Sequence, residues 1–376
     1  MGAIKVLVLY DYFSPAFKAG GPIQSLQNLT DQLGAIFDFS VFSGAFDKGE
    51  KSVLAQVTRN TWNKRENGLK VFYWVPSVFR PGPLVKAVSD HREGVVYING
   101  LYSVYFSMLP LLLKAHRFVL APRGMLHAGA LSQKAFKKRV YLLFFKLLHW
   151  HRKVVFHATD AAEARYIQQA FGPQVRIIVA PNIPRFTGRQ AGVTKSRGSL
   201  KLVSIALLSA MKNIDLVLGA LAQCTAEIDY SIYGPVKDPR YWERCKAILP
   251  TLPGNIRVHY RGEIEPAQVP AALASSHVFV LPSKSENFGH ALFESLSAAR
   301  PVITSHQTPW NDLASQKAGM NVATEGVESL ASAIRFFADM DSETYTAYCD
   351  GAYAVATGFM EKADFNRAYQ LLFSDK

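Results

Sequence analysis

The sequence predicts an α/β fold made of two domains, each built on a doubly wound parallel sheet. The chain has 376 residues, more than one hydrophobic core usually serves. Apolar runs rich in β-forming residues recur along its whole length, and segments with the apolar spacing of helices separate them. Strands that are apolar throughout and alternate with helices form parallel sheets that are covered on both faces.

The expected strands follow one another through both halves of the chain. The first six are expected at 4–10, 37–43, 70–75, 94–100, 117–122 and 153–159. Six more are expected at 176–182, 200–207, 228–234, 255–262, 277–283 and 301–305.

The segment 184–199 is polar and basic and has no apolar periodicity, so it is predicted to link the two domains. We expect an N-terminal, acceptor-binding domain over residues 1–183 and a C-terminal, donor-binding domain over residues 200–354. A final helix, at about 355–376, is expected to pack back on the N-terminal domain.

Positive charge is concentrated in the first half of the chain. Residues 1–197 hold 27 Lys and Arg against 10 Asp and Glu, whereas the rest hold 15 against 19, within a net charge of +13. A basic face can bind nucleic acid, an anionic membrane or an anionic substrate. The sequence contains no zinc-finger spacing, RNP-type motif or basic helix with heptads, so nucleic acid is not expected as a partner.

The cysteine pattern and the N-terminus indicate a cytoplasmic protein. Cys224, Cys245 and Cys349 are widely spaced, which suits a reducing compartment. The first residues, MGAIKVLVLYDYF, lack the basic region of a signal peptide, and Val6 stands where a myristoylation signal needs Ser or Thr.

Two apolar segments of the first half raise the question of a membrane. The run at 101–113 is too short to cross a bilayer and is expected to form a buried helix against the sheet. Residues 133–153 combine apolar side chains at helical spacing with Lys and Arg at both ends. This segment is either an amphipathic helix that lies on anionic lipid or an ordinary helix that packs on the core, and the pattern leaves both open.

The loops that follow the strands are where a doubly wound sheet binds its ligands. After the first strand, Gly20 and Gly21 precede Pro22, so the first amides of a helix are expected to attract an anion there. The loop lacks G-x-G-x-x-G, which disfavours a simple nicotinamide site. After the strand at 200–207, Lys212 precedes Asn213, the expected N-cap of the next helix, and is a candidate partner for a diphosphate.

Three further positions are predicted to contact a nucleotide through their backbone. They are Gly234, Gly262 and Ile264, in the loops after two strands of the second half. Each is also compatible with a simple turn.

The stretch SENFGHALFES at 285–295 places Glu286 and Glu294 between two buried strands. On one helix the two carboxylates would lie roughly 12 Å apart along the axis, too far for a glycosidase pair. If the helix starts near Gly289, the amides of Phe288, Gly289 and His290 face a phosphate, and the carboxylates reach hydroxyls on either side of it. That arrangement suits a nucleotide sugar.

This stretch resembles the signature of the retaining glycosyltransferases of family 4, the glycosyl transferases group 1. Further matching segments are the Gly20-Gly21 loop, KNIDL at 212–216, the strand at 278–283 and Pro181-Asn182. The resemblance implies the GT-B fold, with two Rossmann-like domains facing a central cleft.

The resemblance also implies a role for each matching residue. Glu294 would bind the ribose and Glu286 the hydroxyls of the donor sugar, while Lys212 would neutralise the diphosphate. Asn287, Phe288 and Gly289 would present backbone amides, with His290 beside them. Such enzymes use a UDP- or GDP-linked sugar as donor and need neither a cofactor nor a catalytic metal. We interpret Asp339-Met340-Asp341, a D-x-D sequence, as helix capping.

The sequence departs from the family pattern at the diphosphate site. Family members pair the lysine with an arginine five or six residues earlier, where this chain has Leu207 and Ala206. As a hypothesis, Arg123, Lys134 or Lys138 replaces this cation.

Arg123 also stands where many relatives have a histidine near the reacting sugar, so we predict a catalytic role for it. His127 and His157 are further candidates, although such histidines are more often structural.

Three functions remain open on the sequence alone. The first is transfer to a lipid-linked glycan in the biosynthesis of O-antigen, capsule or exopolysaccharide, by a cytoplasmic enzyme peripheral on the inner face of the cell membrane. It explains both the donor signature and the basic first half. Transfer to a small soluble acceptor explains only the donor signature. Non-catalytic binding of phosphate or nucleic acid explains only the charge.

Overall fold

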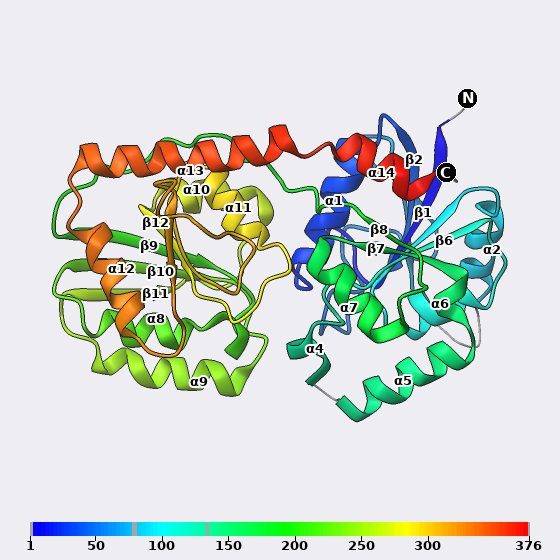
Figure 1. Cartoon of the computed structure of the whole chain (residues 1–376), viewed down its shortest axis with the longest axis horizontal. Coiled ribbons are helices and arrows are strands. Elements are labelled where there is room, and N and C mark those ends of the chain that lie inside the picture. Colours follow the sequence, from blue (N-terminus) through cyan, green and yellow to red (C-terminus); the bar gives the residue numbers. More distant parts are fainter. Residues whose placement is uncertain (1–2, 77–80, 133–134, 375–376) are drawn as a thin grey trace. The chain divides into compact units, whose positions relative to one another are not determined.

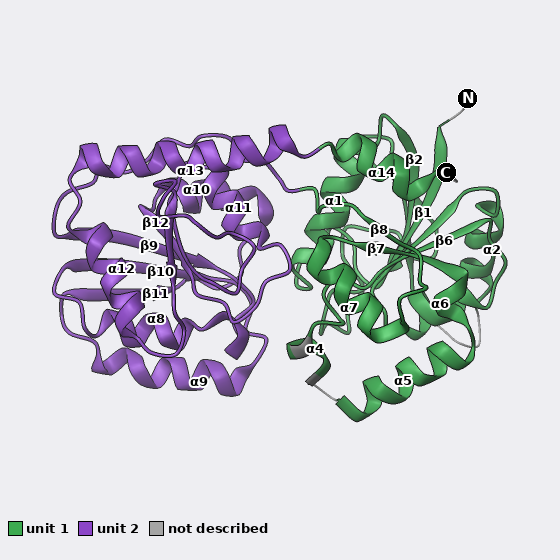
Figure 2. Ribbon diagram, in the orientation of Figure 1, with its two compact units in different colours: residues 1–183, 364–376 green, residues 184–363 purple. Residues whose placement is uncertain are grey.

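The chain folds into two compact units, which we describe separately. The computed structural model describes residues 3–76, 81–132 and 135–374 (Figure 1). Unit 1 consists of Met1–Ile183 and Asp364–Lys376, and unit 2 of Pro184–Ala363 (Figure 2). Figure 1 shows helices on both sides of each sheet.

Unit 1 is built on a sheet with the strand order β3-β4-β2-β1-β5-β6-β7-β8. Its strands are β1 (Ile4–Tyr10), β2 (Phe37–Gly44), β3 (Trp62–Lys64), β4 (Lys70–Trp74), β5 (Val95–Asn99), β6 (Arg117–Ala121), β7 (Val154–Ala158) and β8 (Ile177–Val179). All neighbours pair in parallel except β3, which is antiparallel to β4. The strands expected from the sequence are confirmed, and the short edge strand β3 was not predicted.

The helices of unit 1 include two that begin at a capping aspartate. The helices are α1 (Gly21–Leu33), α2 (Gly82–Asp90), α3 (Leu109–Leu111), α4 (Ala128–Ser132), α5 (Ala135–Leu147), α6 (Trp150–Lys153), α7 (Ala161–Phe171) and α14 (Phe365–Phe373). At the start of α7 the side chain of Asp160 accepts the N–H of Glu163, and Asp364 caps α14 in the same way.

The apolar run at 101–113 forms less helix than predicted. It contains a π-helix, η1 (Val104–Met108), followed directly by the short helix α3. Phe106 and Leu111 are buried as expected, whereas Leu112 is exposed. Among the described residues, no helix has both the length and the apolar character needed to cross a membrane.

Unit 2 has a parallel sheet with the strand order β11-β10-β9-β12-β13-β14. The strands are β9 (Ser199–Ile205), β10 (Glu227–Tyr233), β11 (Ile256–Tyr260), β12 (Val278–Leu281), β13 (Val302–Ser305) and β14 (Gly319–Val322). From β9 the chain moves outward to β10 and β11 and then returns to the other side of β9 as β12. The strand order therefore reverses between β9 and β12.

The helices of unit 2 cover both faces of this sheet (Figure 1). They are α8 (Ile214–Leu221), α9 (Pro239–Ile248), α10 (Val269–Ala274), α11 (His290–Ser297), α12 (Glu328–Ala338) and α13 (Ser342–Lys362), with 3-10 turns η2 (Ala210–Lys212), η3 (Leu249–Thr251) and η4 (Pro266–Gln268). Asp341 accepts the N–H of Thr344 at the start of α13, and Asp339 follows the end of α12. The interpretation of this D-x-D sequence as helix capping is confirmed.

The segment 184–199, predicted as a linker, lies within unit 2. Two buried cations tie its irregular backbone to that unit. Arg300 Nη2 donates to the carbonyl of Ala191 at 2.6 Å, and Lys195 Nζ donates to the carbonyl of Ala338 at 2.8 Å. These bonds attach a polar segment to the unit without any apolar periodicity, so the sequence pattern cannot distinguish it from a solvated linker.

The C-terminal segment 355–376, expected as one helix, is divided between the units. Helix α13 ends at Lys362 in unit 2, because Ala363 is extended and Asp364 caps the next helix. In unit 1, Phe373 of α14 packs against Phe37 and Tyr97, with ring centroids 5.2 and 5.3 Å apart. Tyr369 donates its hydroxyl to the carbonyl of Pro181 at 3.2 Å.

Candidate functional site

The candidate site lies at the carboxyl edge of the unit 2 sheet, where the strand order reverses. Ligands of doubly wound sheets bind at such a switch point, because the loops after the two central strands diverge there. Lys212, in η2, follows β9, and Glu286 follows β12. The two predicted residues thus come from the loops on either side of the switch point.

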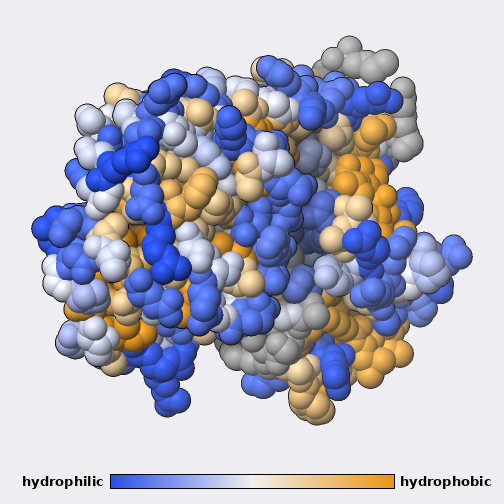
Figure 3. Space-filling view, turned by 60° about the vertical axis from the view of Figure 1, so that its left-hand side comes forward, coloured by the Kyte–Doolittle hydropathy of each residue, from blue (hydrophilic) through white to orange (hydrophobic). Residues whose placement is uncertain are grey.

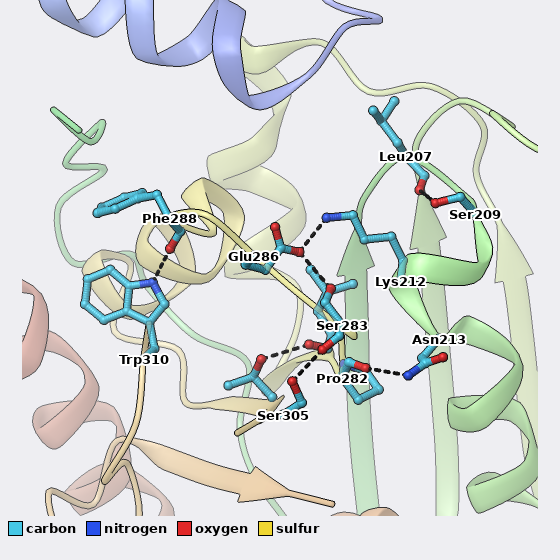
Figure 4. Close-up of polar contacts among 12 residues, drawn as sticks. Leu207, Ser209, Lys212, Asn213, Pro282, Ser283, Glu286, Phe288, Ser305 and Trp310 are labelled. Carbon is cyan, nitrogen blue, oxygen red and sulfur yellow. Dashed lines mark hydrogen bonds and ion pairs between the residues drawn. The ribbon is translucent and has the colours of Figure 1, made fainter. Parts of the chain in front are cut away.

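Lys212 and Glu286 form an ion pair at this edge. Figure 4 shows Lys212 Nζ and the hydroxyl of Ser283 pointing at the same carboxylate oxygen of Glu286. The Ser283 hydroxyl donates to it at 2.7 Å. The Lys212 side chain is 20% exposed and that of Glu286 12%, so both charges are largely removed from water yet still reachable by a ligand.

The two loops that carry this pair are fastened to each other. The N–H of Lys284 donates to the carbonyl of Met211 at 2.9 Å. Asn213 Nδ2 donates to the carbonyl of Pro282 at 2.9 Å (Figure 4). Asn213 stands before α8 as predicted, but its side chain bonds the neighbouring loop and does not cap the helix. The loop-to-loop bonds fix the distance between the cation and the carboxylate.

Helix α11 starts at His290, after Gly289, as the sequence analysis expected. Gly289 has φ 78°, a conformation that costs other residues free energy. Phe288 is buried, and its carbonyl accepts the indole N–H of Trp310 at 2.7 Å (Figure 4). Asn287 lies between this anchored residue and Glu286. The turn therefore holds the start of α11 beside the ion pair.

Glu294 lies one turn further along α11 and is 8% exposed. Burial raises the pKa of its carboxyl to about 7, and the nearby charge of Arg185 lowers it only in part. Among the described residues its carboxylate has no hydrogen-bond partner. A buried carboxyl without a partner is a position at which a hydrogen-bond donor of a ligand would bind favourably.

The three predicted backbone positions of the other loops differ in what they can offer. The N–H of Gly234 donates to the carbonyl of Gly262 at 2.7 Å, so this amide is not available to a phosphate. A Cβ on Gly234 would lie 1.9 Å from the carbonyl oxygen of Ala206, so close packing of the backbone requires glycine at this position. Gly262 has φ 76° and open space around it, and the half-buried Ile264 packs against the core of unit 2.

The predicted residues Gly20, Gly21 and Arg123 lie in unit 1. Gly20 has φ 74° and precedes α1, with Pro22 in the first turn. The carboxylate of the buried Asp47 accepts the N–H groups of Phe17 and Lys18 at 2.9 and 3.0 Å, which shapes this loop. The sequence analysis missed Asp47, whose only signal is its place soon after β2.

Arg123 is committed to a polar network inside unit 1. Its guanidinium donates to Asn99 Oδ1 at 3.0 Å, to Asn182 Oδ1 at 2.6 Å and to the hydroxyl of Tyr97 at 2.8 Å. It therefore joins the carboxyl ends of β5 and β6 to the segment after β8. A catalytic role for Arg123 stays a prediction.

The two candidate histidines are held by unit 1 itself. His157 is fully buried between the Tyr97 hydroxyl at 2.6 Å and the carbonyl of Ala180 at 2.8 Å. Burial, together with the charge of Arg123, lowers the pKa of His157 to about 3, so its imidazole is neutral. His127 accepts the N–H of Gly129 at 3.2 Å and its ring packs on Tyr166.

The cation that would replace the family arginine stays unassigned. Leu207, at the family position, accepts the Ser209 hydroxyl with its carbonyl at 3.4 Å (Figure 4). Lys138 lies on α5, where its ammonium stands 5.3 Å from the ring centroid of Tyr102. Lys134 lies outside the described residues.

Solved structures, one of them of a glycosyltransferase, share this fold along nearly the whole chain. HepE from Anabaena, in complex with UDP and glucose, has a TM-score of 0.67 at 18% identity over 98% of both chains. Sucrose-phosphate synthase from Thermosynechococcus elongatus has a TM-score of 0.72 at 14% identity over 98% of this chain and 97% of its own. WaaG, a glycosyltransferase involved in lipopolysaccharide biosynthesis, has a TM-score of 0.63 at 15% identity over 98% of this chain and 99% of its own. The chain has the GT-B fold.

The match to a known sequence family concerns unit 2. Residues 190–353 match the family model described as glycosyl transferases group 1, and this range lies wholly within unit 2. The match thus covers most of unit 2 and less than half of the whole chain. A search for similar curated proteins found no match.

Proposed function

We propose that the chain transfers a sugar from a nucleotide-diphosphate sugar to a glycan acceptor. The observation that carries this proposal is the ion pair of Lys212 and Glu286 at the switch point of unit 2, followed one turn into α11 by the buried carboxyl of Glu294. We propose that Lys212 and the start of α11 bind the diphosphate, Glu286 the hexose and Glu294 the ribose of the donor.

In the proposed reaction, negative charge grows on the diphosphate oxygen as its bond to the sugar breaks. The ammonium of Lys212 and the amides at the start of α11 stabilise this charge from fixed positions. Without a ligand, Glu286 neutralises Lys212. When the diphosphate takes over Lys212, the carboxylate of Glu286 becomes free to accept hydroxyls of the donor sugar.

We further propose that the reaction retains the anomeric configuration and uses no catalytic metal. The leaving phosphate itself would take the proton of the acceptor hydroxyl on the front face, so that no side-chain nucleophile takes part. The support for these two points is the resemblance in sequence alone.

For the donor we propose a UDP-linked sugar first and a GDP-linked sugar second. HepE, which shares the fold, binds UDP and UDP-glucose in its solved complexes. For the acceptor we propose a lipid-linked glycan in cell-surface polysaccharide biosynthesis. This acceptor accounts for the basic composition of residues 1–197, and WaaG, with the same fold, takes part in lipopolysaccharide biosynthesis.

The proposal is tested by a thermal-shift screen of UDP-, GDP- and ADP-sugars on the purified chain. A true donor raises the melting temperature by mass action, with the size of the shift set by the ligand concentration relative to its Kd. The same donor should then be consumed when a polyprenyl-linked glycan is added. If no nucleotide sugar shifts the melting temperature of the wild type, the chain is not a transferase of this kind.

A further inference from the structure

Helix α5 of unit 1 is held to the protein by one of its two apolar faces. Phe145 is fully buried, with its ring centroid 5.6 Å from that of Trp150 and 5.2 Å from that of Phe171. Tyr141, one turn earlier, donates its hydroxyl to the carbonyl of Leu101 at 2.5 Å. These contacts fix the rotation of the helix about its own axis.

The opposite face of α5 is apolar as well, and it is exposed. Phe136, Val140, Leu143 and Leu147 recur at the spacing i, i+4, i+7 and i+11, which puts them roughly 160–220° around the helix from Phe145. Their exposed fractions are 80, 37, 56 and 61%. Phe144 and Leu148, 57 and 50% exposed, widen this surface. We call these six residues the outer stripe.

Single exposed apolar side chains are ordinary in proteins, but five on one short helix and a sixth just after it are typical of a binding surface. Figure 3 shows apolar side chains, in orange, at the lower right of the face drawn, with hydrophilic side chains beside them. Helix α5 is the lowest element of unit 1 in Figure 1, and a turn about the vertical axis leaves it there.

Cations border the outer stripe on both sides. Arg139 and Lys146 lie on one flank and Lys137 on the other, and all three are exposed. Arg152 and Lys153, also exposed, follow just after the helix. The sequence contains no Asp or Glu between Glu93 and Asp160, so this positive charge has no acidic neighbours along the chain.

We infer that the outer stripe docks unit 1 onto an anionic lipid surface. The apolar side chains would enter the boundary between headgroups and acyl chains, while the flanking cations would meet lipid phosphates. This resolves the alternatives left open for residues 133–153, because the helix both packs on the core and presents a second apolar face. The inference stands apart from the proposed reaction, since lipid binding needs neither donor nor acceptor.

A second copy of the chain fits this surface less well. Two outer stripes packed face to face would bring Lys137, Arg139 and Lys146 of each copy against one another, and like charges across an interface repel. The helix also offers no carboxylate that could pair with them. A lipid surface supplies the negative charge that the helix lacks.

The test is flotation of the full chain with vesicles of phosphatidylcholine alone and of phosphatidylcholine with about 30% phosphatidylglycerol, at low and high salt. The wild type should float with the anionic vesicles, less so at high salt, and poorly with the neutral ones. In the variant with Phe136→Ser and Leu143→Ser, binding should be at least about tenfold weaker, because two apolar side chains no longer leave water.

Matched controls distinguish binding by the outer stripe from nonspecific apolar adsorption and from the effect of the total net charge. Leu371→Ser removes an apolar side chain of 46% exposure from α14 and should leave flotation unchanged. Lys137→Gln with Lys146→Gln should weaken binding, whereas Lys51→Gln with Lys237→Gln lowers the net charge equally at other exposed sites and should not. Circular dichroism verifies the fold of each variant.

Two results would overturn the inference. One is flotation that is equal in the wild type and in the Phe136→Ser, Leu143→Ser variant. The other is a wild type that ignores anionic vesicles but sediments as a dimer, with the same two substitutions restoring the monomer, which would assign the stripe to a second copy.

Discussion

At the scale of single residues, the burial of the Glu294 carboxyl lowers the stability of the free protein. This carboxyl is buried in unit 2, has no hydrogen-bond partner among the described residues, and has a pKa raised from 4.5 to about 7. A packed core would place an apolar side chain or an amide at such a position. This burial is consistent with the proposed role of the carboxyl, which is to accept hydrogen bonds from ligand hydroxyls.

Glu294→Gln is expected to stabilise the free protein in a pH-dependent way. Below pH about 4.5 the carboxyl is protonated in both the folded and the unfolded state, so it does not change the free energy of unfolding. As the pH rises from there toward about 7, the unfolded state loses this proton before the folded state does, and the free energy of unfolding falls. The gain from Gln should thus grow between these values to about 3 kcal/mol. Chemical denaturation at several pH values measures it, and the same variant should bind UDP more weakly.

A pH-independent difference between Glu294→Gln and the wild type would contradict this assignment. It would mean that the carboxyl stays solvated in the folded protein. Glu328→Gln, on the exposed start of α12, serves as the control with no burial.

The ion pair of Lys212 and Glu286 leads to a second prediction at this scale. Lys212→Ala and Glu286→Gln should each lower the transfer rate by at least about two orders of magnitude, since each removes a charge that acts on the transition state. Lys246→Ala, which breaks an exposed ion pair with Glu243 on α9, should leave the rate unchanged. The measurement is the steady-state rate with the donor that the thermal-shift screen identifies.

The double variant distinguishes catalysis from folding. Each single change leaves one charge unpaired in a largely buried place, so the double variant should be more stable than Lys212→Ala. The transfer rate of the double variant should stay as low as that of the slower single variant. Near wild-type transfer rates in both single variants would contradict a catalytic site at this edge of the sheet.

At the scale of elements, the turn before α11 depends on a residue without a side chain. Gly289 holds φ 78°, and a Cβ there would lie 2.8 Å from Cδ1 of Leu292. We predict that Gly289→Ala destabilises the protein by about 1–2 kcal/mol, the usual cost of the left-handed conformation. Denaturant unfolding measures this, and Gly254→Ala, with open space and no positive φ, is the control.

Gly289→Ala should also weaken nucleotide binding, because the strain is relieved by turning the amides that precede α11. An unchanged affinity for UDP in a destabilised Gly289→Ala variant would show that these amides do not contact the ligand. In that case the site would consist of side chains alone.

The element pattern of this chain was readable wherever the signal is local. Continuous apolar runs identified the parallel strands except β14 (Gly319–Val322), which was not predicted. The start of α11 followed from Gly289 and the spacing of Glu286 and Glu294. The edge strand β3 was missed because Trp62–Lys64 is short and mostly exposed, so it has no apolar run. The end of α13 was missed because α14 begins only three residues later, after its cap Asp364. The two helices therefore look like one continuous helix in the sequence.

At the candidate site, the sequence identified the residues that belong to a motif but not the residues that hydrogen-bond to them. Ser283 is only the last residue of a matching segment, and Trp310 belongs to no motif. The fold alone shows that they bind Glu286 and Phe288. Gly234 was a reasonable candidate from its loop, yet its amide is used by Gly262. Hydrogen bonds between distant loops are tertiary facts, which spacing along the chain does not encode.

At the scale of the whole molecule, each unit has a hydrophobic core of its own. The basic segment 184–199 belongs to unit 2 because Arg300 and Lys195 bury their charges against its backbone and that of neighbouring loops. A ligand that binds only at the carboxyl edge of the unit 2 sheet should therefore stabilise that unit selectively. Hydrogen exchange can follow both units of the intact chain in one experiment.

We predict that UDP slows amide exchange at 209–216 and 282–297, the two loops and the helix starts that carry Lys212, Glu286 and Glu294. At a hundred times its Kd, UDP adds about 2.7 kcal/mol to the stability of the state that binds it, so the change is well within measurement. Segments of unit 1 such as β2 and α7 should exchange as before. The Lys212→Ala variant, in equal UDP, should lose most of the protection.

Exchange in the loop at 17–24 decides the role of Gly20 and Gly21. Protection there by a UDP-sugar, but not by UDP alone, would show that the amides of the Gly-Gly loop act on the transferred sugar. Protection by neither would confine the donor to unit 2 and leave that loop to the acceptor. Protection in unit 1 without any in 282–297 would contradict the donor site, because the loops of β9 and β12 cannot bind a diphosphate and keep their amides equally free to exchange.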